Sequence, residues 1–350
     1  MSHEVVFAVP GDLATPTGGY AYDRRIIAEL EALGWRVHVL DLGSEFPRPG
    51  PAALEEARRR LEAVPPGRRI VIDGLALGVL PEAAISLATT HKPIGLIHHP
   101  LAFEAGLSPS EASALRLSER AALAPMRHVI VTSPSTARLL VADYGVPTER
   151  ITVAMPGVDR APRRDRQASE TISLLSVGSL VPRKGYDILL EALGRVTDFP
   201  WRLTIAGDRS RNPETAAAIE AGIAAMNLGA RVTLAGAVSE ERLAEFYGEA
   251  DLFVLASRFE GYGMAFADAL AHAVPVIGTT AGAIAETVPA EAGVLVSPDD
   301  VAAFAEALRR VIGDGEERRR LAAGAQAAAA RLPTWAQAAQ AFAAALEAVR

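Results

Sequence analysis

Short runs of β-branched and apolar residues alternate with longer segments whose apolar positions recur every three to four residues. In the first half, the runs that predict strands lie at residues 5–9, 36–40, 70–72, 94–97, 128–132 and 151–154. In the second half, they lie at residues 173–177, 202–206, 231–235, 252–256, 274–277 and 294–296. Helical periods fill the gaps between them. This alternation predicts an α/β fold with parallel sheets.

A polar segment rich in arginine and proline, residues 159–170, interrupts the alternation and is typical of a linker. We therefore predict two Rossmann-like domains, residues 1–165 and 166–333, facing across a cleft with ligands bound at the carboxyl ends of the strands. Half of the 350 residues are hydrophobic, which is enough for two cores. Residues 334–350 are helical by propensity, and we expect them to pack back onto the first domain.

Composition excludes several function classes. The chain has no cysteine, so disulfides, thiolate metal sites and cysteine nucleophiles are ruled out. Its net charge of −7 argues against general nucleic-acid binding. The amino-terminal sequence lacks the pattern of a signal peptide, and we expect a cytoplasmic protein. The arginine run at residues 58–60 predicts a solvated helix face, with peripheral contact to an anionic membrane as the alternative.

The stretch TPTGGYAYDRR, residues 15–25, follows the first predicted strand and leads into a helix expected at residues 21–33. Glycines at such a junction commonly approach an anion. Gly18 and Gly19 lack the third glycine of a dinucleotide fingerprint, so a dehydrogenase is disfavoured.

Two segments of the second half carry the most specific signals. In VGSLVPRKG, residues 177–185, Lys184 lies at an expected helix start, where a lysine is favourable if an anion is bound there. In FEGYGMAFADALA, Glu260 follows a strand, and we place Asp268 about two turns into the next helix. Two carboxylates so placed can bind two hydroxyl-bearing parts of one ligand, while the amides of the glycine turn bind a phosphate.

The pair His98 and His99 ends the strand at residues 94–97. A histidine at such a strand end can hydrogen-bond a sugar hydroxyl or polarise a reacting centre. Alternation along a strand sends the two rings to opposite faces, so we expect one of them to face the ligand.

Taken together, these motifs resemble the retaining glycosyltransferases of the GT-B fold, family four, a superfamily that includes glycogen-synthase-like and mannosyltransferase-like enzymes. The motifs that carry the resemblance are PTGGYAYD, HH, PGVD, VGSLVPRKG, AGD, GAV and FEGYGMAFADALA, and they span almost the whole chain. The resemblance implies transfer of a hexose from a nucleoside-diphosphate sugar, with UDP or GDP, to a hydroxyl acceptor.

The resemblance also implies residue roles. It places Gly18, Gly19 and Lys184 at the donor diphosphate, Glu260 on sugar hydroxyls, Asp268 on the ribose, and the backbone of Ala237 and Val238 beside the base. His98, His99, Lys184 and Glu260 are the catalytic candidates. The full donor-binding set that it implies is Gly18, Gly19, Ser179, Arg183, Lys184, Asp208, Ala237, Val238, Glu260, Gly261, Tyr262, Gly263 and Asp268.

Two positions depart from the family pattern. Ser179 stands where an arginine is usual, and Asp268 replaces the usual glutamate. These changes bear on donor identity more than on the reaction class. No D-x-D motif occurs in the chain, so we expect metal-independent activity with no metal site and no cofactor beyond the donor. Paired carboxylates like those of glycosidases are not evident either.

Alternatives are a nucleotide-sugar epimerase on the same fold and a two-domain sugar-binding protein without catalysis. The acceptor stays open among lipids, saccharides and small metabolites. The loops expected to select it are residues 102–113 and 42–51.

Overall fold

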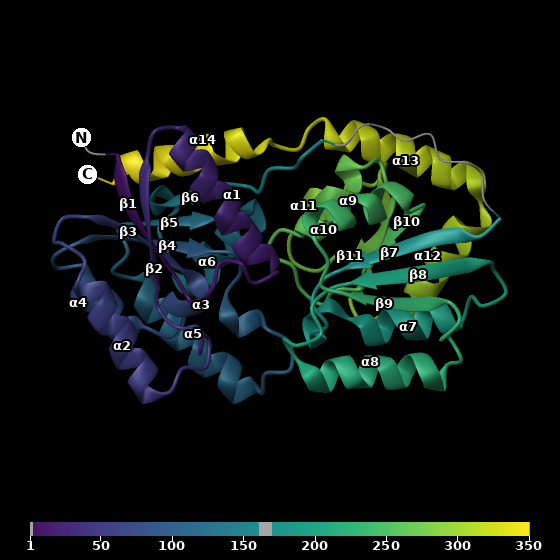
Figure 1. The fold of residues 1–350 in the computed structure, drawn as a ribbon, viewed down its shortest axis with the longest axis horizontal. Helices are drawn as coiled ribbons and strands as arrows, with labels where there is room; N and C mark the ends of the chain where they lie inside the picture. Colours follow the sequence, from purple (N-terminus) through teal and green to yellow (C-terminus); the bar gives the residue numbers. More distant parts are fainter. Residues whose placement is uncertain (1–2, 161–169, 350) are drawn as a thin grey trace. The chain divides into compact units, whose positions relative to one another are not determined.

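The computed structural model describes residues 3–160 and 170–349. These form two compact units (Figure 1). The described parts of the first unit are residues 3–15, 19–157 and 333–349, and those of the second are residues 16–18, 158–160 and 170–332. The predicted linker at residues 159–170 lies mostly outside the described residues. No helix among residues 3–160 and 170–349 is both long enough and apolar enough to cross a bilayer.

The first unit is a six-stranded parallel sheet in the order β2-β1-β3-β4-β5-β6. Its strands are β1 (Glu4–Val9), β2 (Arg36–Asp41), β3 (Arg69–Asp73), β4 (Lys92–Ile97), β5 (His128–Val131) and β6 (Ile151–Val153). Its helices are α1 (Gly18–Ala32), α2 (Pro51–Glu62), α3 (Gly74–Leu77), α4 (Pro81–Leu87), α5 (Pro109–Leu123), α6 (Pro134–Tyr144) and α14 (Trp335–Ala348). Short 3₁₀ turns occur at Leu101–Phe103 and Thr148–Arg150.

The second unit repeats the architecture, with strand order β12-β11-β10-β7-β8-β9, again parallel. Its strands are β7 (Ile172–Val177), β8 (Trp201–Ala206), β9 (Val232–Gly236), β10 (Leu252–Val254), β11 (Val276–Thr279) and β12 (Gly293–Val296). Its helices are α7 (Tyr186–Gly194), α8 (Pro213–Ala225), α9 (Glu240–Glu249), α10 (Met264–Ala271), α11 (Ile284–Thr287), α12 (Val301–Gly313) and α13 (Gly315–Ala329), and a 3₁₀ turn spans Pro182–Lys184. The predicted α/β fold with two Rossmann-like domains is confirmed.

Helices cover both faces of the first sheet. Successive side chains of its strands point to opposite faces, and apolar side chains occur on both. On β1, Ala8 joins the cluster that packs under α2 and α4, whereas Phe7 stacks on Phe342 of α14 with ring centroids 6.0 Å apart. In Figure 1, α14 lies beside the strands of this unit, next to β6. The terminal helix is thus part of the first unit's core.

The strand order places a topological switch point in each sheet. The chain leaves β1 toward β2 on one side and returns to place β3 on the other, and it does the same between β7 and β10. Ligands of open α/β sheets bind outside the carboxyl ends of the strands at such points. These two positions are where chemistry is expected.

Three helix boundaries differ from the sequence interpretation. Helix α1 begins at Gly18, so both glycines belong to its first turn and not to a preceding loop. Lys184 ends a 3₁₀ turn two residues before α7, and Gly185 is the N-cap residue. Helix α10 begins at Met264, so Asp268 lies about one turn into it rather than two. In the last two cases a glycine with positive φ delays the helix.

Candidate functional site

The switch point of the second unit holds a compact group of charges. Lys184, from the turn after β7, places Nζ 2.7 Å from Oε1 of Glu260, which follows β10. Arg183 places Nη1 3.3 Å from the other carboxylate oxygen, and Ser257 donates a hydrogen bond of 2.7 Å to Oε1. All three charged side chains are largely buried. We call Arg183, Lys184 and Glu260 the lysine–glutamate cluster.

The lysine–glutamate cluster pairs two cations with one carboxylate. Burial alone would raise the pKa of Glu260, but the charges of Lys184 and Arg183 outweigh it and hold that pKa at about 2. The carboxylate is therefore ionised at neutral pH, and two cations share it. Two cations in a mostly buried position are suited to an anionic ligand, while the carboxylate can accept hydrogen bonds from hydroxyl groups.

Arg258 fixes the turn that carries Lys184. Its guanidinium forms a fork on Asp187 with distances of 2.7 and 3.0 Å, and it also donates to the carbonyl of Pro182 at 2.8 Å and to Asp299 at 2.7 Å. Its backbone amide donates to the carbonyl of Arg183. One arginine thus ties the 3₁₀ turn, the start of α7 and the loop before α12 to the strand end that leads to Glu260.

Two glycines allow the backbone to pack tightly around the cluster. Gly185 has φ of +63°, and a Cβ placed on it would lie 2.0 Å from the carbonyl oxygen of Ala256. Gly282, also at +63°, would bring a Cβ within 2.2 Å of the carbonyl oxygen of Glu260. Only glycine fits both the dihedral angle and the space at these points.

The remaining predicted donor residues lie in loops at the same edge of the second sheet. Backbone hydrogen bonds join the loops after β7, β8 and β9, from Leu180 to Asp208 and from Gly207 to Gly236. Ser179 is half-buried beside them, and the Asp208 carboxylate accepts from Ser210 within its own loop. Ala237 is exposed and Val238 half-buried after β9. The structure therefore brings these loops to one edge.

The glycine turn before α10 is buried. Gly261, Tyr262 and Gly263 are all buried, and Gly263, with φ of +90°, is the N-cap residue. The hydroxyl of Tyr262 has no hydrogen-bond partner among the described residues, and burial raises its pKa, with the charge of Asp268 adding to the effect. Asp268 is half-buried on α10. Asp268 and Tyr262 therefore influence each other electrostatically.

The switch point of the first unit holds a different group. His98 follows β4, Asp73 ends β3, and Asp23 lies on the inner side of α1. Nε2 of His98 lies 3.2 Å from Oδ1 of Asp23 and 3.3 Å from Oδ2 of Asp73. Both carboxylates are buried, whereas the His98 side chain is 20% exposed. We call these three residues the histidine–aspartate cluster.

Opposing effects act on the histidine–aspartate cluster. Burial alone would lower the pKa of His98, but the two carboxylates outweigh it and raise it to about 10. Burial raises the pKa of Asp23 to about 6, although His98 acts in the opposite direction. One oxygen of each aspartate and Nε2 all lie within 4.8 Å of one another, a spacing that a metal ion also accepts.

The sequence did not show that the carboxylates of Asp23 and Asp73 approach each other. Asp23 and Asp73 come from elements 50 residues apart, so no local motif announces their approach. A glycosidase mechanism still does not follow, because both carboxylates are buried and face an imidazole instead of open space.

His99 points to a different partner, as strand alternation requires. Its Nε2 lies 2.5 Å from Oε1 of Glu104. Gly19, in the first turn of α1, lies against His98, and a Cβ there would lie 3.5 Å from Cδ2 of that ring. Gly18 is exposed and belongs to the second unit. The structure thus brings Gly19 and His98 together and turns His99 toward Glu104.

Glu119 supports the segment after the two histidines. It is buried on α5 and accepts hydrogen bonds from the amides of Leu101 and Ala102, at 2.6 and 3.3 Å, and from the hydroxyl of Tyr144 at 3.1 Å. Burial raises its pKa to about 7. This carboxylate fixes the 3₁₀ turn that follows Pro100.

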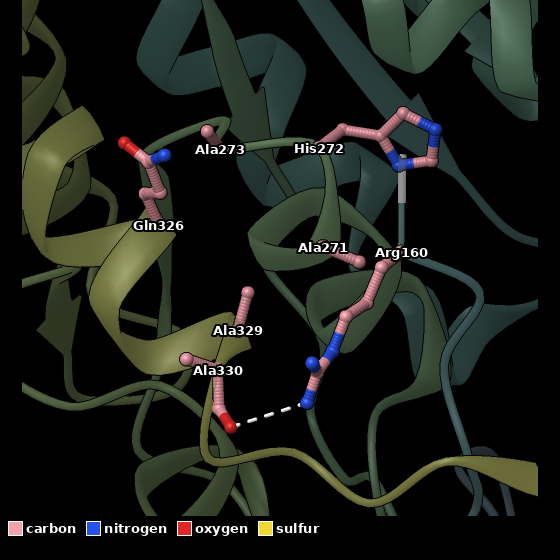
Figure 2. Close-up of a pocket in the computed structure, with 7 residues that line it drawn as sticks. All are labelled: Arg160, Ala271, His272, Ala273, Gln326, Ala329 and Ala330. Carbon is pink, nitrogen blue, oxygen red and sulfur yellow. Dashed lines mark hydrogen bonds between the residues drawn. The ribbon is translucent and has the colours of Figure 1, made fainter. Parts of the chain in front are cut away.

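A pocket of about 240 Å³ lies elsewhere in the second unit (Figure 2). It is lined by Ala271, His272 and Ala273 at the end of α10, by Arg160, and by Gln326, Ala329 and Ala330 at the end of α13 and just after it. Arg160 donates to the carbonyl of Ala330. Its position at the carboxyl end of α10 is opposite to the end that follows Glu260. This pocket therefore does not coincide with the predicted donor residues.

The arginine run on α2 is balanced by glutamates. Arg58 pairs with Glu55 and Glu62, and Arg59 and Arg60 pair with Glu56. These exposed pairs leave the helix face with little surplus positive charge.

Sequence reasoning missed Asp23, Asp73, Glu119 and Arg258, and two of them left a signal. Asp23 lies three residues before Ile26 and seven before Leu30, which places a carboxylate on the apolar stripe of α1. Asp73 directly follows the apolar run Ile70–Ile72, at a strand end. A charged residue at a position that the pattern buries is a candidate for function.

Comparison with known proteins identifies the family. Residues 171–314 match the family described as glycosyl transferases group 1, and residues 76–161 match Glycosyltransferase Family 4. The chain is 30% identical over 280 residues to the D-inositol 3-phosphate glycosyltransferase of Xylanimonas cellulosilytica, covering 73% of this chain and 67% of that protein. It is also 30% identical over 173 residues to the mannosylfructose-phosphate synthase of Agrobacterium fabrum, covering 45% of this chain and 38% of the relative. The chain thus spans less than two thirds of some of its relatives.

Solved structures share the whole fold. Sucrose-phosphate synthase from Thermosynechococcus elongatus superposes with a TM-score of 0.84 at 23% identity, covering 99% of this chain and 98% of that one. Anabaena HepE, solved with UDP and glucose, gives a TM-score of 0.76 at 18% identity, covering 99% of both chains. The resemblance seen in the sequence motifs is confirmed, and the chain belongs to the family-four-like glycosyltransferases of the GT-B fold.

Proposed function

We propose that this glycosyltransferase is a retaining, metal-independent enzyme that moves a hexose from a nucleoside-diphosphate sugar to a hydroxyl acceptor. The observation that carries the proposal is the lysine–glutamate cluster at the switch point of the second sheet. Its two cations are suited to a diphosphate, and its carboxylate is suited to the hydroxyl groups of a sugar. The first unit is the proposed acceptor-binding domain.

In the proposed reaction, the acceptor oxygen forms a bond to the anomeric carbon as the bond from that carbon to the diphosphate oxygen breaks. The diphosphate leaves with the electron pair and takes the acceptor's proton. Lys184 stabilises the charge that develops on the leaving oxygen. Retention is supported by family membership, since in this family the acceptor attacks from the side of the leaving group.

Metal independence is supported by the chemistry of the second unit. Lys184 and Arg183 supply positive charge where a diphosphate would otherwise require a divalent cation, and the chain contains no D-x-D motif. We propose that Asp268 accepts from the ribose and that Ala237 and Val238 flank the base. His98 or His99 then contacts the transferred sugar or the acceptor.

The names of similar proteins suggest the first substrates to try. HepE was solved with UDP and glucose, and the names of three relatives mention inositol phosphate, mannosylfructose phosphate and sucrose phosphate. We propose a UDP- or GDP-linked hexose as donor, and a small polyol or sugar as the first acceptor class to test, with lipid-linked acceptors next.

The test is nucleotide release from UDP- and GDP-linked glucose and mannose, with and without candidate acceptors. Slow release that accelerates with one acceptor supports transfer, and the anomeric proton coupling of the product reports retention. Abolition of turnover by EDTA contradicts metal independence. Interconversion of the sugars without nucleotide release identifies an epimerase instead.

A further inference from the structure

The histidine–aspartate cluster has an unusual arrangement of partners. The same ring atom of His98, Nε2, faces carboxylate oxygens of both Asp23 and Asp73, at 3.2 and 3.3 Å. Nε2 is buried, so the exposed fifth of the side chain belongs to its other atoms. Nε2 of His98 and both carboxylate oxygens of Asp23 have no partner in hydrogen-bond geometry among residues 3–160 and 170–349, so the contacts of the ring with the two aspartates are close contacts between charges.

Few other groups act on this ring. Asp23 and Tyr22 face it from α1, Asp73 faces it from the end of β3, and Thr132 donates to the backbone carbonyl of His98 from the loop after β5. The edge of Tyr22 meets the ring at a centroid distance of 5.3 Å, while its hydroxyl donates to the carbonyl of Ala154. His99 is turned to Glu104. The described groups contribute no second cation to these contacts.

The charge of the cluster depends on the protons of His98. Without a proton on Nε2, its lone pair would face the carboxylate oxygens of Asp23 and Asp73 in a buried space, and these groups would repel one another. With a proton on Nε2 alone and both aspartates ionised, the cluster would hold two uncompensated negative charges, which burial disfavours. With both ring nitrogens protonated, the positive charge of the imidazolium balances one of the two carboxylate charges. The arrangement therefore favours the imidazolium form.

We propose that Asp23 and Asp73 are positioning residues that hold His98 as a doubly protonated imidazolium, anchored through Nε2, so that it serves as a fixed cation and hydrogen-bond donor. Its exposed edge is then suited to a lone-pair-bearing oxygen of a sugar or an acceptor.

One consequence rests on the proposed function. A histidine that already carries both protons cannot take the proton of the acceptor hydroxyl. That proton must leave by another route, and the departing diphosphate oxygen is the route that the proposed reaction provides. His98 would then assist by orientation and charge and not as a general base.

The experiment follows the ring protons directly. The full chain is labelled with ¹⁵N-histidine and long-range ¹H–¹⁵N spectra are recorded from about pH 5.5 to 9 in the presence of EDTA. His98→Gln identifies the His98 signals among the seven histidines. We expect both ring nitrogens of His98 to stay protonated to at least about pH 8. In Asp23→Asn and in Asp73→Asn, we expect its proton affinity to fall at least about tenfold.

The matched control is Thr152→Val, which removes the partner of a different histidine, because Nε2 of His128 lies 2.8 Å from Oγ1 of Thr152. It should shift the His128 signals and leave those of His98 in place. Asp73→Glu keeps the charge and should restore most of the proton affinity, which a purely structural role would not predict.

Two outcomes overturn the proposal. One is a His98 that titrates near its ordinary pKa in the unmodified chain. The other is stoichiometric binding of added Zn²⁺ that deprotonates His98 and is lost in Asp23→Asn, which makes the cluster a metal site. If Asp23→Asn does not fold, Asp73→Asn alone decides. The spectra need no donor, so a failure of the proposed transfer reaction leaves this test unaffected.

Discussion

The ammonium group of Lys184 and the carboxylate of Glu260, 76 residues apart in sequence, lie 2.7 Å apart. The family resemblance implies that they bind separate parts of the donor, Lys184 the diphosphate and Glu260 the sugar. Their contact means that each side chain holds the other in place. A donor that binds both groups must therefore share or replace this ion pair.

Replacing Lys184 by methionine should lower kcat/KM for nucleotide release by roughly 100-fold or more. In the proposed reaction the change removes one cation from the leaving group, and a loss of this kind costs about 3 kcal/mol of transition-state stabilisation. Steady-state rates with the preferred donor measure it. Arg195→Gln is the control, because the ion-pair partner of Arg195 in the described part of the chain is exposed Glu191, one turn away, and this change should leave the rate unchanged. Equal rates in Lys184→Met and in the unchanged protein would show that Lys184 does not stabilise the leaving group.

The stability of the second unit should depend on pH through Glu260. Because the folded pKa of Glu260 is lowered to about 2 from 4.5, its stabilising contribution is present above about pH 4.5 and is lost as pH falls toward 2. The expected loss across that window is about 3 kcal/mol. Glu260→Gln should lack this part of the pH dependence.

Urea unfolding at several pH values, followed by the fluorescence of Trp201, measures the stability of the second unit once the other two tryptophans have been replaced. Trp201 is buried in the second unit, and the other two tryptophans, Trp35 and Trp335, lie in the first. Both are changed to phenylalanine for the measurement. An unchanged acid slope in Glu260→Gln would show that Glu260 is not the group that titrates.

Arg258→Lys should reduce kcat/KM by about tenfold, equivalent to about 1.4 kcal/mol, with little loss of folded protein. A lysine cannot form the fork on Asp187 while also holding Pro182 and Asp299, so the turn that carries Lys184 loses its anchor. Asp299→Asn removes one of these contacts and should have a smaller effect. If Arg258→Lys is as active as the unchanged protein, the turn keeps its position without the contacts of Arg258.

Gly19→Ala and Gly19→Val separate two roles of the first turn of α1. Alanine should fold well and add up to about 1 kcal/mol of stability, because its Cβ meets His98 at an ordinary contact distance of 3.5 Å and glycine is a poor helix former. Valine adds bulk beside His98 and should lower turnover at least about tenfold. Thermal unfolding and nucleotide release measure the two effects. Unchanged donor binding and turnover in Gly19→Val would leave the glycines as a structural helix start only.

The strands were predictable because parallel sheets buried on both faces require short continuous apolar runs. Each predicted strand agrees with the structure to within two residues at either end. Helix starts were harder to place. Glycine favours a loop in isolation, yet Gly18 and Gly19 are helical, since the rest of α1 buries Tyr22, Ile26 and Leu30 and tertiary packing outweighs the local preference.

Candidate residues in the second unit could be located because Lys184 and Glu260 each follow a strand end, and strand ends in parallel sheets share an edge. Their mutual contact could not be predicted, because it depends on the strand order that places β7 beside β10. The same reason hid the approach of Asp23 and Asp73. Strand order is set by long-range packing, which one sequence does not display.

The position of α14 has a consequence for biosynthesis. This helix completes the core of the first unit, with Phe342 on Phe7 and the guanidinium of Arg25 5.0 Å above the ring of Trp335, yet it follows the whole second unit in the chain. During translation, one face of the first sheet therefore stays incompletely covered after β6 has been made. The ribosome adds nearly two hundred further residues before α14 begins. Nascent chains of this protein should need shielding at that face until α14 has been synthesised.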